Sequence, residues 1–521
     1  MSTPLRFRIP SLLATRTVIA ALKARWNVVQ APPVAVHRSF LDTADWRVYR
    51  AGWTLEVDRA PSGTRTEKIS MALSGAESEA LLVRTATDGT PTFAEDLPPV
   101  SPWAAVAAVV EDRRLLPQLE VDSHWHELSI RNDDDKTTAK ISIAWHRLLD
   151  ESGREHQLRM ATVTPVRGYE RTAERIADAL RDAGLRPQER PLLPLALNIL
   201  GRPQPGAQLG PGVELDRSMP AAEAVAAILG RLRYHVESNE AGVRQQLDIE
   251  FLHDYRVAIR RARSILRSVH RALPPDEAHA LAAELGWLAQ MTSAPRDLDV
   301  HLVELRSANG DLGPFNKYLT ERRQVVQAEL VAALDSVRYR QLIESWDALV
   351  GATGGSPSAP DANRPAGEEA DALIARAYRR VLRRGGAIDA ASPPEALHDL
   401  RKRAKELRYL LECFQSLYPE PARTSVIKEL KALQDNLGEF QDCQVQAEAV
   451  RIMADDLLSS GAPASTLKAM AGMAETLEER ERRARLEFDA RFSQFSSPAN
   501  QRRMAKLVSG RTGSGRKKTG P

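Results

Sequence analysis

The chain has 521 residues, of which 43% are hydrophobic and 27% charged, so it can bury more than one hydrophobic core. Its 72 basic and 69 acidic residues leave a net charge of only +3, which is not the charge of a globally basic nucleic-acid binder. Its two cysteines and the lack of an apolar run of about 18 residues argue against a disulfide framework, a cysteine zinc site and a membrane span. We therefore expect a multidomain protein of the cytoplasm, without an export signal.

The first 200 residues predict an α+β domain. Apolar and polar residues alternate in Leu5–Ile9, Thr54–Arg59 and Ala139–Ala144, which is typical of strands with one buried face. Ser11–Trp26 and Tyr169–Gly184 have helical periodicity instead. A mixture of strands and helices in this order favours an antiparallel sheet with covering helices.

Composition changes sharply after this domain. Residues 201–216 are rich in Pro and Gly and are predicted to form a linker. Residues 217–500 are rich in Ala, Leu, Arg and Glu with helical spacing, and a second Pro/Gly/Ser-rich stretch at 351–367 divides them. The tail 501–521 is basic and rich in Gly and Ser, which predicts disorder.

The helical half contains an internal repeat with an offset of 145 residues and no gap. The tripeptide Leu-His-Asp at 252–254 recurs at 397–399, and Pro274 recurs as Pro419. The match includes apolar, His, Pro and Asp positions, so it exceeds the similarity of two Arg-rich helices. We predict a duplicated helical bundle, with one copy at about 217–350 and the other at about 368–500.

Each copy predicts a helix with a basic face opposite an apolar face. On a helical wheel the basic residues of the first copy cover an arc of about 80°. Residues 253–271 contain six Arg and one Asp, so this helix lacks acidic partners of its own. The stripe is about 21 Å long, which suits a linear, repetitive anion. Its members are His253, Arg256, Arg260, Arg263 and Arg267 in the first copy, and His398, Arg401, Lys405 and Arg408 in the second.

Two simpler interpretations remain open. A basic stripe can be a solvated face laced with ion pairs, and its partners would be the nearby acidic residues. The two histidines can be structural residues near a helix start or donors to phosphate. They do not lie in sequence clusters of carboxylates, cysteines or other histidines, so a metal site is not predicted. The acidic candidates for holding the arginines are Asp254, Asp297, Asp299, Asp399 and Asp442.

The segments LHDYRVAIRRARSIL at 252–266 and LHDLRKRAKELRYLL at 397–411 resemble the CHAD domain, the conserved histidine α-helical domain. The resemblance covers about 217–500. It implies two four-helix bundles with pseudo-twofold symmetry and a basic cleft between them that binds inorganic polyphosphate. The predicted contacts are the members of both stripes, together with Arg231, Arg376, Arg379 and Arg383.

SFLDTADWRVYRAGWTLEVDR at 39–59 and VTPVRGYERTAERIADALRDAGLRP at 163–187 resemble the CYTH domain, a triphosphate tunnel fold. The metal-binding glutamates of the family's first strand correspond here to Ser2 and Pro4, and a strand that should present arginines carries Glu56 and Asp58. We expect these carboxylates to repel triphosphate. The resemblance thus implies a degenerate domain that serves as a scaffold or interaction module. The residues left for a lesser anion site are Arg6, Arg8, Arg47, Arg50, Lys68 and Lys140.

We therefore predict a non-catalytic polyphosphate-binding protein that needs no cofactor and no metal and that associates with polyphosphate granules in the cytoplasm. The alternative from another class is binding to the phosphate backbone of nucleic acid. Aromatic residues make up only 5% of the chain and are absent from the basic faces, which argues against stacking on single-stranded bases. Residual triphosphatase activity in the first 200 residues is the third interpretation.

Overall fold

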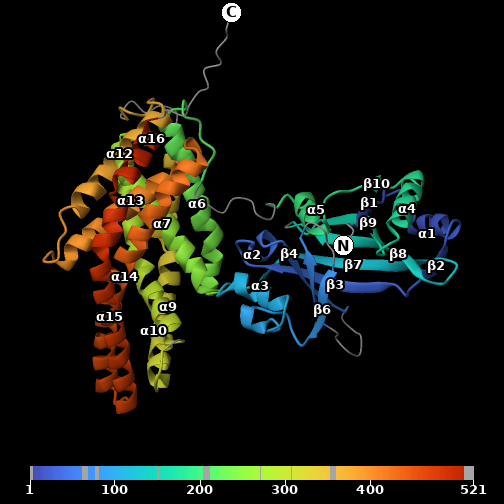
Figure 1. Cartoon of the computed structure of the whole chain (residues 1–521), viewed down its shortest axis with the longest axis horizontal. Helices are drawn as coiled ribbons and strands as arrows, with labels where there is room; N and C mark the ends of the chain where they lie inside the picture. The colour runs from blue at the N-terminus through green and yellow to red at the C-terminus, as the bar shows by residue number, and fades with distance from the viewer. Residues whose placement is uncertain are drawn as a thin grey trace, which may run out of the picture. The chain divides into compact units, whose positions relative to one another are not determined.

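The computed structural model describes residues 4–60, 69–76, 81–150, 152–202, 212–269, 271–306, 308–352 and 359–509. The chain divides into two compact units, Met1–Leu209 and Gly210–Pro521, and each is described by itself (Figure 1). Ser2, Lys68 and parts of three expected segments lie outside the described residues. These parts are 203–211 of the linker, 353–358 of the dividing stretch and 510–521 of the tail.

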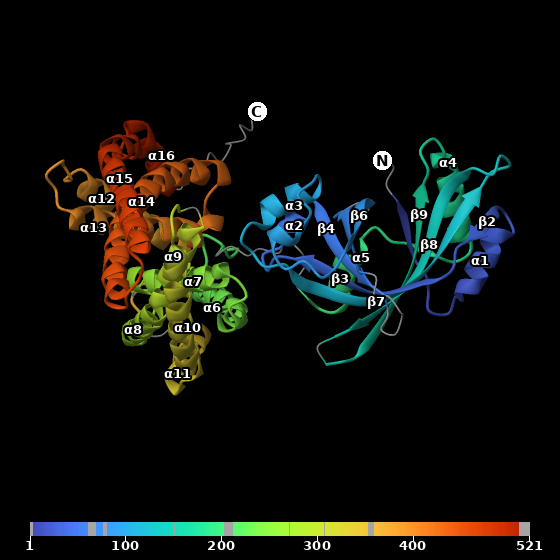
Figure 2. The same ribbon diagram turned by 90° about the horizontal axis from the view of Figure 1, so that it is seen from below.

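The first unit is built on one antiparallel sheet with the strand order β10-β1-β9-β8-β7-β3-β4-β5-β6, and β2 pairs with β7. The long strands β7 and β8 are easily followed in Figure 2. The predicted α+β class is therefore confirmed. The strands are β1 Leu5–Arg8, β2 Asn27–Gln30, β3 Val34–Asp42, β4 Trp53–Arg59, β5 Ile69–Gly75, β6 Leu81–Thr87, β7 Leu116–Arg131, β8 Thr137–Leu149, β9 Glu155–Pro165 and β10 Arg186–Pro187.

Alternation along the strands gives the sheet two different faces. On one face, Leu55 and Val57 of β4 pack with α2 (Arg47–Arg50) and α3 (Trp103–Val110). Farther along the same face, β7, β8 and β9 pack with α1 (Thr15–Lys23) and α4 (Glu170–Asp182). On the other face, Phe40 and Met160 pack against α5 (Leu192–Ile199), whose sequence is almost wholly apolar. The helices therefore bury apolar surface on both sides of the sheet.

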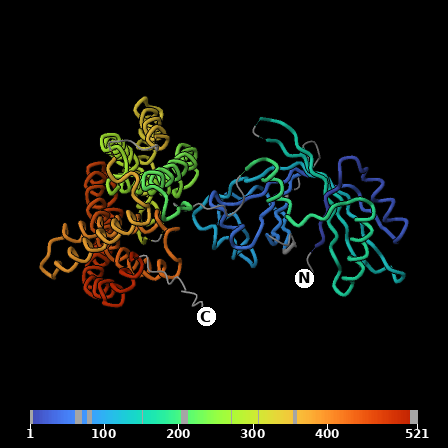
Figure 3. The backbone as a smooth tube through the Cα atoms, turned by 90° about the horizontal axis from the view of Figure 1, so that it is seen from above, coloured from blue at the N-terminus to red at the C-terminus, as the bar shows by residue number. Residues whose placement is uncertain are grey.

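The second unit is all-α in its described residues, as predicted. Its first half, green to yellow in Figure 3, lies beside its second half, orange to red. The helices of the first half are α6 Ala221–Gln245, α7 Ile249–Ser268, α8 Pro275–Met291, α9 Ser293–Leu305, α10 Gly313–Asp335 and α11 Val337–Gly351. Those of the second half are α12 Ala366–Gly385, α13 Pro394–Cys413, α14 Glu420–Ser459, α15 Ala464–Phe495 and α16 Pro498–Val508.

The helix boundaries repeat with the offset of the sequence. The starts of α6 and α12 are residues 221 and 366, those of α7 and α13 are 249 and 394, and those of α8 and α14 are 275 and 420. Reciprocal backbone hydrogen bonds join the two copies. Ala221 N donates to Arg364 O (2.8 Å), and Ala366 N donates to Met219 O (2.8 Å). Because each bond maps onto the other at the same offset, a local twofold axis passes between the residues that bridge there, Pro220 and Pro365.

The two copies differ in how their helices are divided. In the first copy, a break at Thr292 separates α8 from α9, whereas α14 of the second copy runs unbroken for 40 residues. Pro295 explains the break, because its ring removes a backbone donor and crowds the carbonyl four residues earlier. Its counterpart in α14 is Phe440. Ser336, which caps α11, likewise separates α10 from α11. The described first copy is therefore divided into more helices than the second, in which α14 and α15 are continuous and α16 follows.

Candidate anion-binding site

The two basic helices, α7 and α13, pack against each other within the helical unit (Figure 1). Arg261 Nη2 donates to Glu412 Oε2 (2.5 Å), and the Arg261 guanidinium lies 5.9 Å from the ring centre of Tyr409. Farther along, Ser268 Oγ lies 3.5 Å from Glu406 Oε1. The non-stripe sides of the helices therefore hold the copies together.

Four cations from the two copies influence one another at this junction. Burial, together with the charges of Arg401, Arg260 and Arg256, lowers the pKa of Lys405 to about 8. Arg260 and Lys405 are counterparts at the repeat offset. Neither makes a hydrogen bond or ion pair with any residue that the structure describes. We name Arg256, Arg260, Arg401 and Lys405 the central cation group.

Arg256 is anchored by neutral oxygens. The residue is only 6% exposed, and its Nη1 donates to Thr292 Oγ1 (2.8 Å), Ser293 Oγ (3.2 Å) and Ala289 O (3.2 Å). Burial, together with the charge of Arg260, lowers the pKa of Arg256 to about 10. The wheel placed Arg256 on an open basic stripe; the structure buries it, because the hydroxyls of the α8–α9 break accept its hydrogen bonds.

Arg401, the counterpart of Arg256, is held by a carboxylate instead. Its Nη2 lies 2.9 and 3.0 Å from the two carboxylate oxygens of Asp442, while its Nε is buried without a hydrogen-bond partner. The counterparts of Thr292 and Ser293 in α14 are Leu437 and Gly438, which offer no hydroxyl. Asp442 has an accessible side chain (58% exposed), so the pair is open to solvent.

The other acidic candidates have different roles. Asp299 is buried and pairs with Arg323 of α10 (2.6 Å), which is not a stripe residue. Asp399 lies 3.5 Å from Arg384 and 3.6 Å from Arg403, neither of which is a stripe residue. Burial raises the pKa of Asp297, which the nearby Arg256 and Arg260 partly offset. Few acidic groups are thus available to the central cation group.

The two stripe histidines have different neighbours. His398 Nδ1 lies 2.7 Å from Gln441 Oε1; because that oxygen only accepts, Nδ1 donates and Nε2 remains for a ligand. Burial lowers the pKa of His253, and the charge of Arg296 acts in the same direction. Arg296 and Gln441 are counterparts at the repeat offset. Sequence reasoning missed both, although they directly precede the Asp297 and Asp442 positions that it did select.

The outer parts of the stripes are partly neutralised. Arg408 Nε donates to Glu412 (2.6 Å) and its Nη1 to Gln434 (3.3 Å). Arg263 packs over Gly286 of α8, where an added Cβ would come within 3.1 Å of its Nη2, and its Nε has no hydrogen-bond partner. Arg267 is exposed near the end of α7. These residues flank the central cation group without belonging to it.

Four predicted contacts lie on α6 and α12 rather than on the stripes. Arg231 stacks over Tyr234 of its own helix (5.2 Å). Arg379 Nε donates to Ala375 O, again in its own helix (3.3 Å). Arg376 lies within electrostatic range of Asp361, beside the Pro220–Pro365 bridge. Among the described residues, Arg376, Arg379 and Arg383 make no hydrogen bond or ion pair with the central cation group.

The first unit corrects one expectation. Glu56 and Asp58 do not present free negative charge, because Arg38 of β3 contacts both of them (2.9 and 2.7 Å) and Arg84 of β6 contacts Asp58 (2.8 Å). Burial raises the pKa of Asp58, but the bonds from Arg38 and Arg84 outweigh it and the net shift is downward. Cross-strand pairing of β3 and β4 places these charges opposite each other, so they neutralise one another.

Four of the cations selected for a lesser anion site in this unit contact separate groups of the protein. Arg6 is 7% exposed and donates to Glu189 O (3.3 Å). Arg47 and Arg50 both contact Asp45 (3.0 and 3.3 Å), and Lys140 lies 3.9 Å from Glu127. Most of the selected cations are therefore engaged by separate protein groups.

In the part of the chain that the structure describes, no three His, Cys, Asp or Glu side chains are placed to hold a metal ion. None of the described helices combines the length and the apolar composition needed to cross a membrane.

Comparison with known proteins agrees with the repeated basic helices. Residues 227–451 match the family model of the CHAD domain. The helical unit is therefore similar to the CHAD domain over these residues, and it is preceded by a unit whose antiparallel sheet is the fold class that the CYTH resemblance implies.

An uncharacterized protein of Mycobacterium tuberculosis (strain CDC 1551 / Oshkosh) is 26% identical over 438 residues, which cover 76% of this chain and 75% of that protein. The crystal structure of the CHAD domain from the plant Ricinus communis is 25% identical, covers 55% of this chain and 94% of its own, and has a TM-score of 0.48. A Hippeastrum protein described as an adenylyl cyclase with a dominant triphosphatase activity is 11% identical, covers 40% of this chain and all of its own (100%), and has a TM-score of 0.28.

Proposed function

We propose that the helical unit binds inorganic polyphosphate through the central cation group and the flanking stripe residues, without catalysing a reaction. The observation that carries this proposal is the proximity of two like charges, Arg260 of one copy and its counterpart Lys405 of the other. Both are cations without a carboxylate partner among the described residues, and each lies within electrostatic range of the other. A ligand that meets them touches both copies at once.

Electrostatics favours an anionic ligand here. Burial lowers the pKa values of Lys405 and Arg256, and the like charges around them act in the same direction, because bringing like charges together is unfavourable. Phosphate oxygens at this position would offset the repulsion and accept charge-assisted hydrogen bonds. A linear polyphosphate also extends beyond the centre to Arg263, His398 and Arg408. Contact with several sites on one chain raises the effective concentration of each phosphate for the next cation.

The chemistry of both units supports binding rather than turnover. In the first unit the carboxylates of β4 are neutralised by arginines, and α5 covers part of the same sheet face. A triphosphatase would need clustered carboxylates for a divalent metal. We assign that unit the role of a scaffold or interaction module.

Salt dependence and competition test this proposal on the full chain. The affinity for long-chain polyphosphate should fall at least about 100-fold between about 50 and 200 mM salt, because several cations replace counterions on the polyanion. Duplex DNA of equal total charge should compete poorly, since a wide duplex presents its phosphates on a surface and not along a thin chain. Binding that ignores salt would contradict the proposal, and equal competition by DNA would favour the nucleic-acid alternative.

A further inference from the structure

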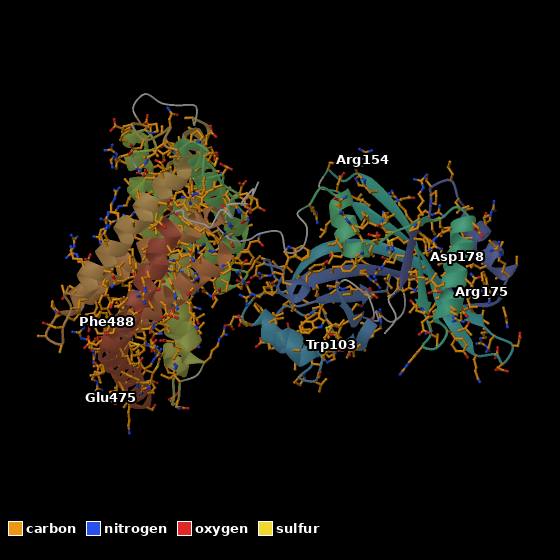
Figure 4. The ribbon with its side chains drawn as sticks, turned by 45° about the horizontal axis from the view of Figure 1, so that its top comes forward. Trp103, Arg154, Arg175, Asp178, Glu475 and Phe488 are labelled. Atoms are coloured by element: carbon orange, nitrogen blue, oxygen red, sulfur yellow. The ribbon has the colours of Figure 1, made fainter. Side chains whose placement is uncertain are left out.

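The seam between α14 and α15 contains an open groove of about 520 Å³, outside the basic stripes. Its lining residues recur every three or four positions on each helix, so they form two facing stripes. On α15 the lining residues lie between Arg480 and Arg491. Figure 4 labels Phe488, a residue of this segment, and Glu475, which precedes it on the same helix. This volume is within the range of small-molecule sites.

The first copy shows what the same seam looks like when it is filled. On α8 and α11, three of the positions 145 residues earlier hold larger aromatic side chains. Trp287 stands where α14 has Ala432, and Tyr339 where α15 has Ala484. Trp346, which corresponds to Arg491, is completely buried. Three aromatic residues of the first copy thus correspond to two alanines and an arginine among the residues that line the groove.

The correspondence holds in space as well as in sequence. Arg233 of α6 pairs with Asp347 of α11 (3.2 Å). Their counterparts are Tyr378 of α12 and Phe492 of α15, and Tyr378 packs against Phe495, one turn after Phe492 on α15, with ring centres 5.4 Å apart. The helix that closes each seam therefore contacts the first helix of its own copy within one turn of the same position.

An arginine occurs at the same position of the seam in both copies, but only the first copy provides an aromatic ring for it to stack on. In the first copy, the Arg338 guanidinium lies over the ring of Trp287 at 4.3 Å and pairs with Glu284 (2.7 Å). The counterpart of Arg338 is Arg483, which faces Ala432 and has no ring to stack on. Within the described residues Arg483 makes no ion pair or hydrogen bond. A guanidinium that points at an open groove is available to a ligand anion.

Acceptors are available beside it. Asn436 is 7% exposed and donates Nδ2 to Ala484 O (2.8 Å), but its Oδ1 accepts no hydrogen bond. Asp435 lines the same groove without a described ion pair. A buried amide oxygen without a donor is unusual in a folded protein and marks a place where a donor is missing.

The other charged side chains of the groove form carboxylate–guanidinium pairs. Glu439 is paired with Arg480 (2.8 Å), and Glu487 is paired with Arg491 (3.3 Å). Three carboxylates and three guanidinium groups then line the groove, so it does not attract a polyanion as the stripes do. The groups left over are one carboxylate, one amide oxygen and one guanidinium.

We propose that this groove binds a small zwitterion, a free α-amino acid. Its ammonium group would donate to Asp435 and to Asn436 Oδ1, and its carboxylate would accept from Arg483. Ala432 and Ala484 leave space for its side chain. The proposal goes beyond polyphosphate binding and does not depend on it.

Saturation-transfer NMR on the full chain tests this site with L-glutamine, L-lysine and L-glutamate at millimolar concentration. At least one of them should receive saturation, whereas glycine betaine should receive none, because its quaternary ammonium has no N–H to donate. Ala432→Trp should weaken binding at least about tenfold, since Trp287 shows that this seam accepts the ring. Arg483→Gln should weaken it similarly, and the matched control Arg482→Gln, which pairs outside the groove with Glu479, should leave it unchanged.

Several outcomes would overturn the site. These are no saturation of any amino acid, equal saturation of glycine betaine, or unchanged binding by a folded Ala432→Trp variant. Displacement of the amino acid by polyphosphate would also count against it, because it would place the amino acid in the basic site. Circular dichroism of each variant verifies that the helices are intact.

Discussion

The two helical copies hold corresponding arginines in different ways. Arg256 is buried and bonded to two hydroxyls and a carbonyl, while Arg401 is paired with a solvent-accessible carboxylate. A neutral anchor fixes a guanidinium without consuming its charge, whereas a carboxylate cancels it. The comparison teaches that a symmetric scaffold can carry an asymmetric electrostatic site, with the stronger positive potential on the first copy.

Charge reversal at the junction should have the largest effect on polyphosphate affinity. We expect Arg260→Glu and Lys405→Glu each to lower polyphosphate affinity about 100-fold, since each places a negative charge among three remaining cations. The double change Arg379→Gln with Arg383→Gln on α12 is the matched control and should change affinity by less than about threefold. Isothermal calorimetry separates the cases: two independent sites would retain the original affinity at half the stoichiometry, which would refute a shared site.

Removing either of the two corresponding arginines should change the free energy of unfolding, with opposite signs for Arg256 and Arg401. Arg256→Met should raise the free energy of unfolding by about 1 kcal/mol, because it removes a desolvated charge that lacks a carboxylate. Arg401→Met should lower it by less than about 1 kcal/mol, since its ion pair is accessible to water. Urea unfolding measures both. Both variants should lose polyphosphate affinity, so a stabilised Arg256→Met that binds as tightly as the wild type would show that Arg256 is not part of the site.

The smallest expected effect is a pH dependence that belongs to one copy. The pKa of Lys405 is about 8 in the folded protein, so raising the pH from 7 to 9 should neutralise it and weaken polyphosphate binding about threefold. Phosphate would raise this pKa, so binding should take up protons near pH 8. Lys405→Arg should abolish the dependence, because a guanidinium stays charged. A wild-type affinity that is flat from pH 7 to 9 would contradict it.

Stability should change with the opposite sign in the free protein. The pKa of Lys405 in the folded state is lowered from 10.5, so between about pH 8 and 10.5 the unfolded chain binds more protons than the folded one. The contribution of Lys405 to the free energy of unfolding therefore rises with pH in this window, as the unfavourable charge is lost. Comparing the wild type with Lys405→Arg isolates this contribution.

Periodicity predicted much of the helical unit correctly. The apolar side of α7 is buried as the wheel indicates, with Tyr255, Ile259 and Ala262 all fully enclosed. A wheel gives the direction of a side chain but not its tertiary neighbour. It could not show that Thr292 would reach Arg256, because the break that presents this hydroxyl depends on Pro295 in another helix.

The first unit was harder to interpret for a related reason. The sequence shows that β4 carries two carboxylates, but their charge depends on the residue opposite in the neighbouring strand. Arg38 faces Asp58 only once the register of β3 and β4 is known. Pairing across strands is set by the whole sheet, so local composition alone predicted repulsion where the structure has neutral pairs.

The bridge between Pro220 and Pro365 has the form of an isologous interface, in which the same surface appears twice and contacts itself. In a homodimer any substitution appears on both sides of such an axis. Here both sides belong to one chain, so each position can be changed alone. That freedom is visible in the filled seam of one copy and the open groove of the other, which a dimer of identical subunits could not combine.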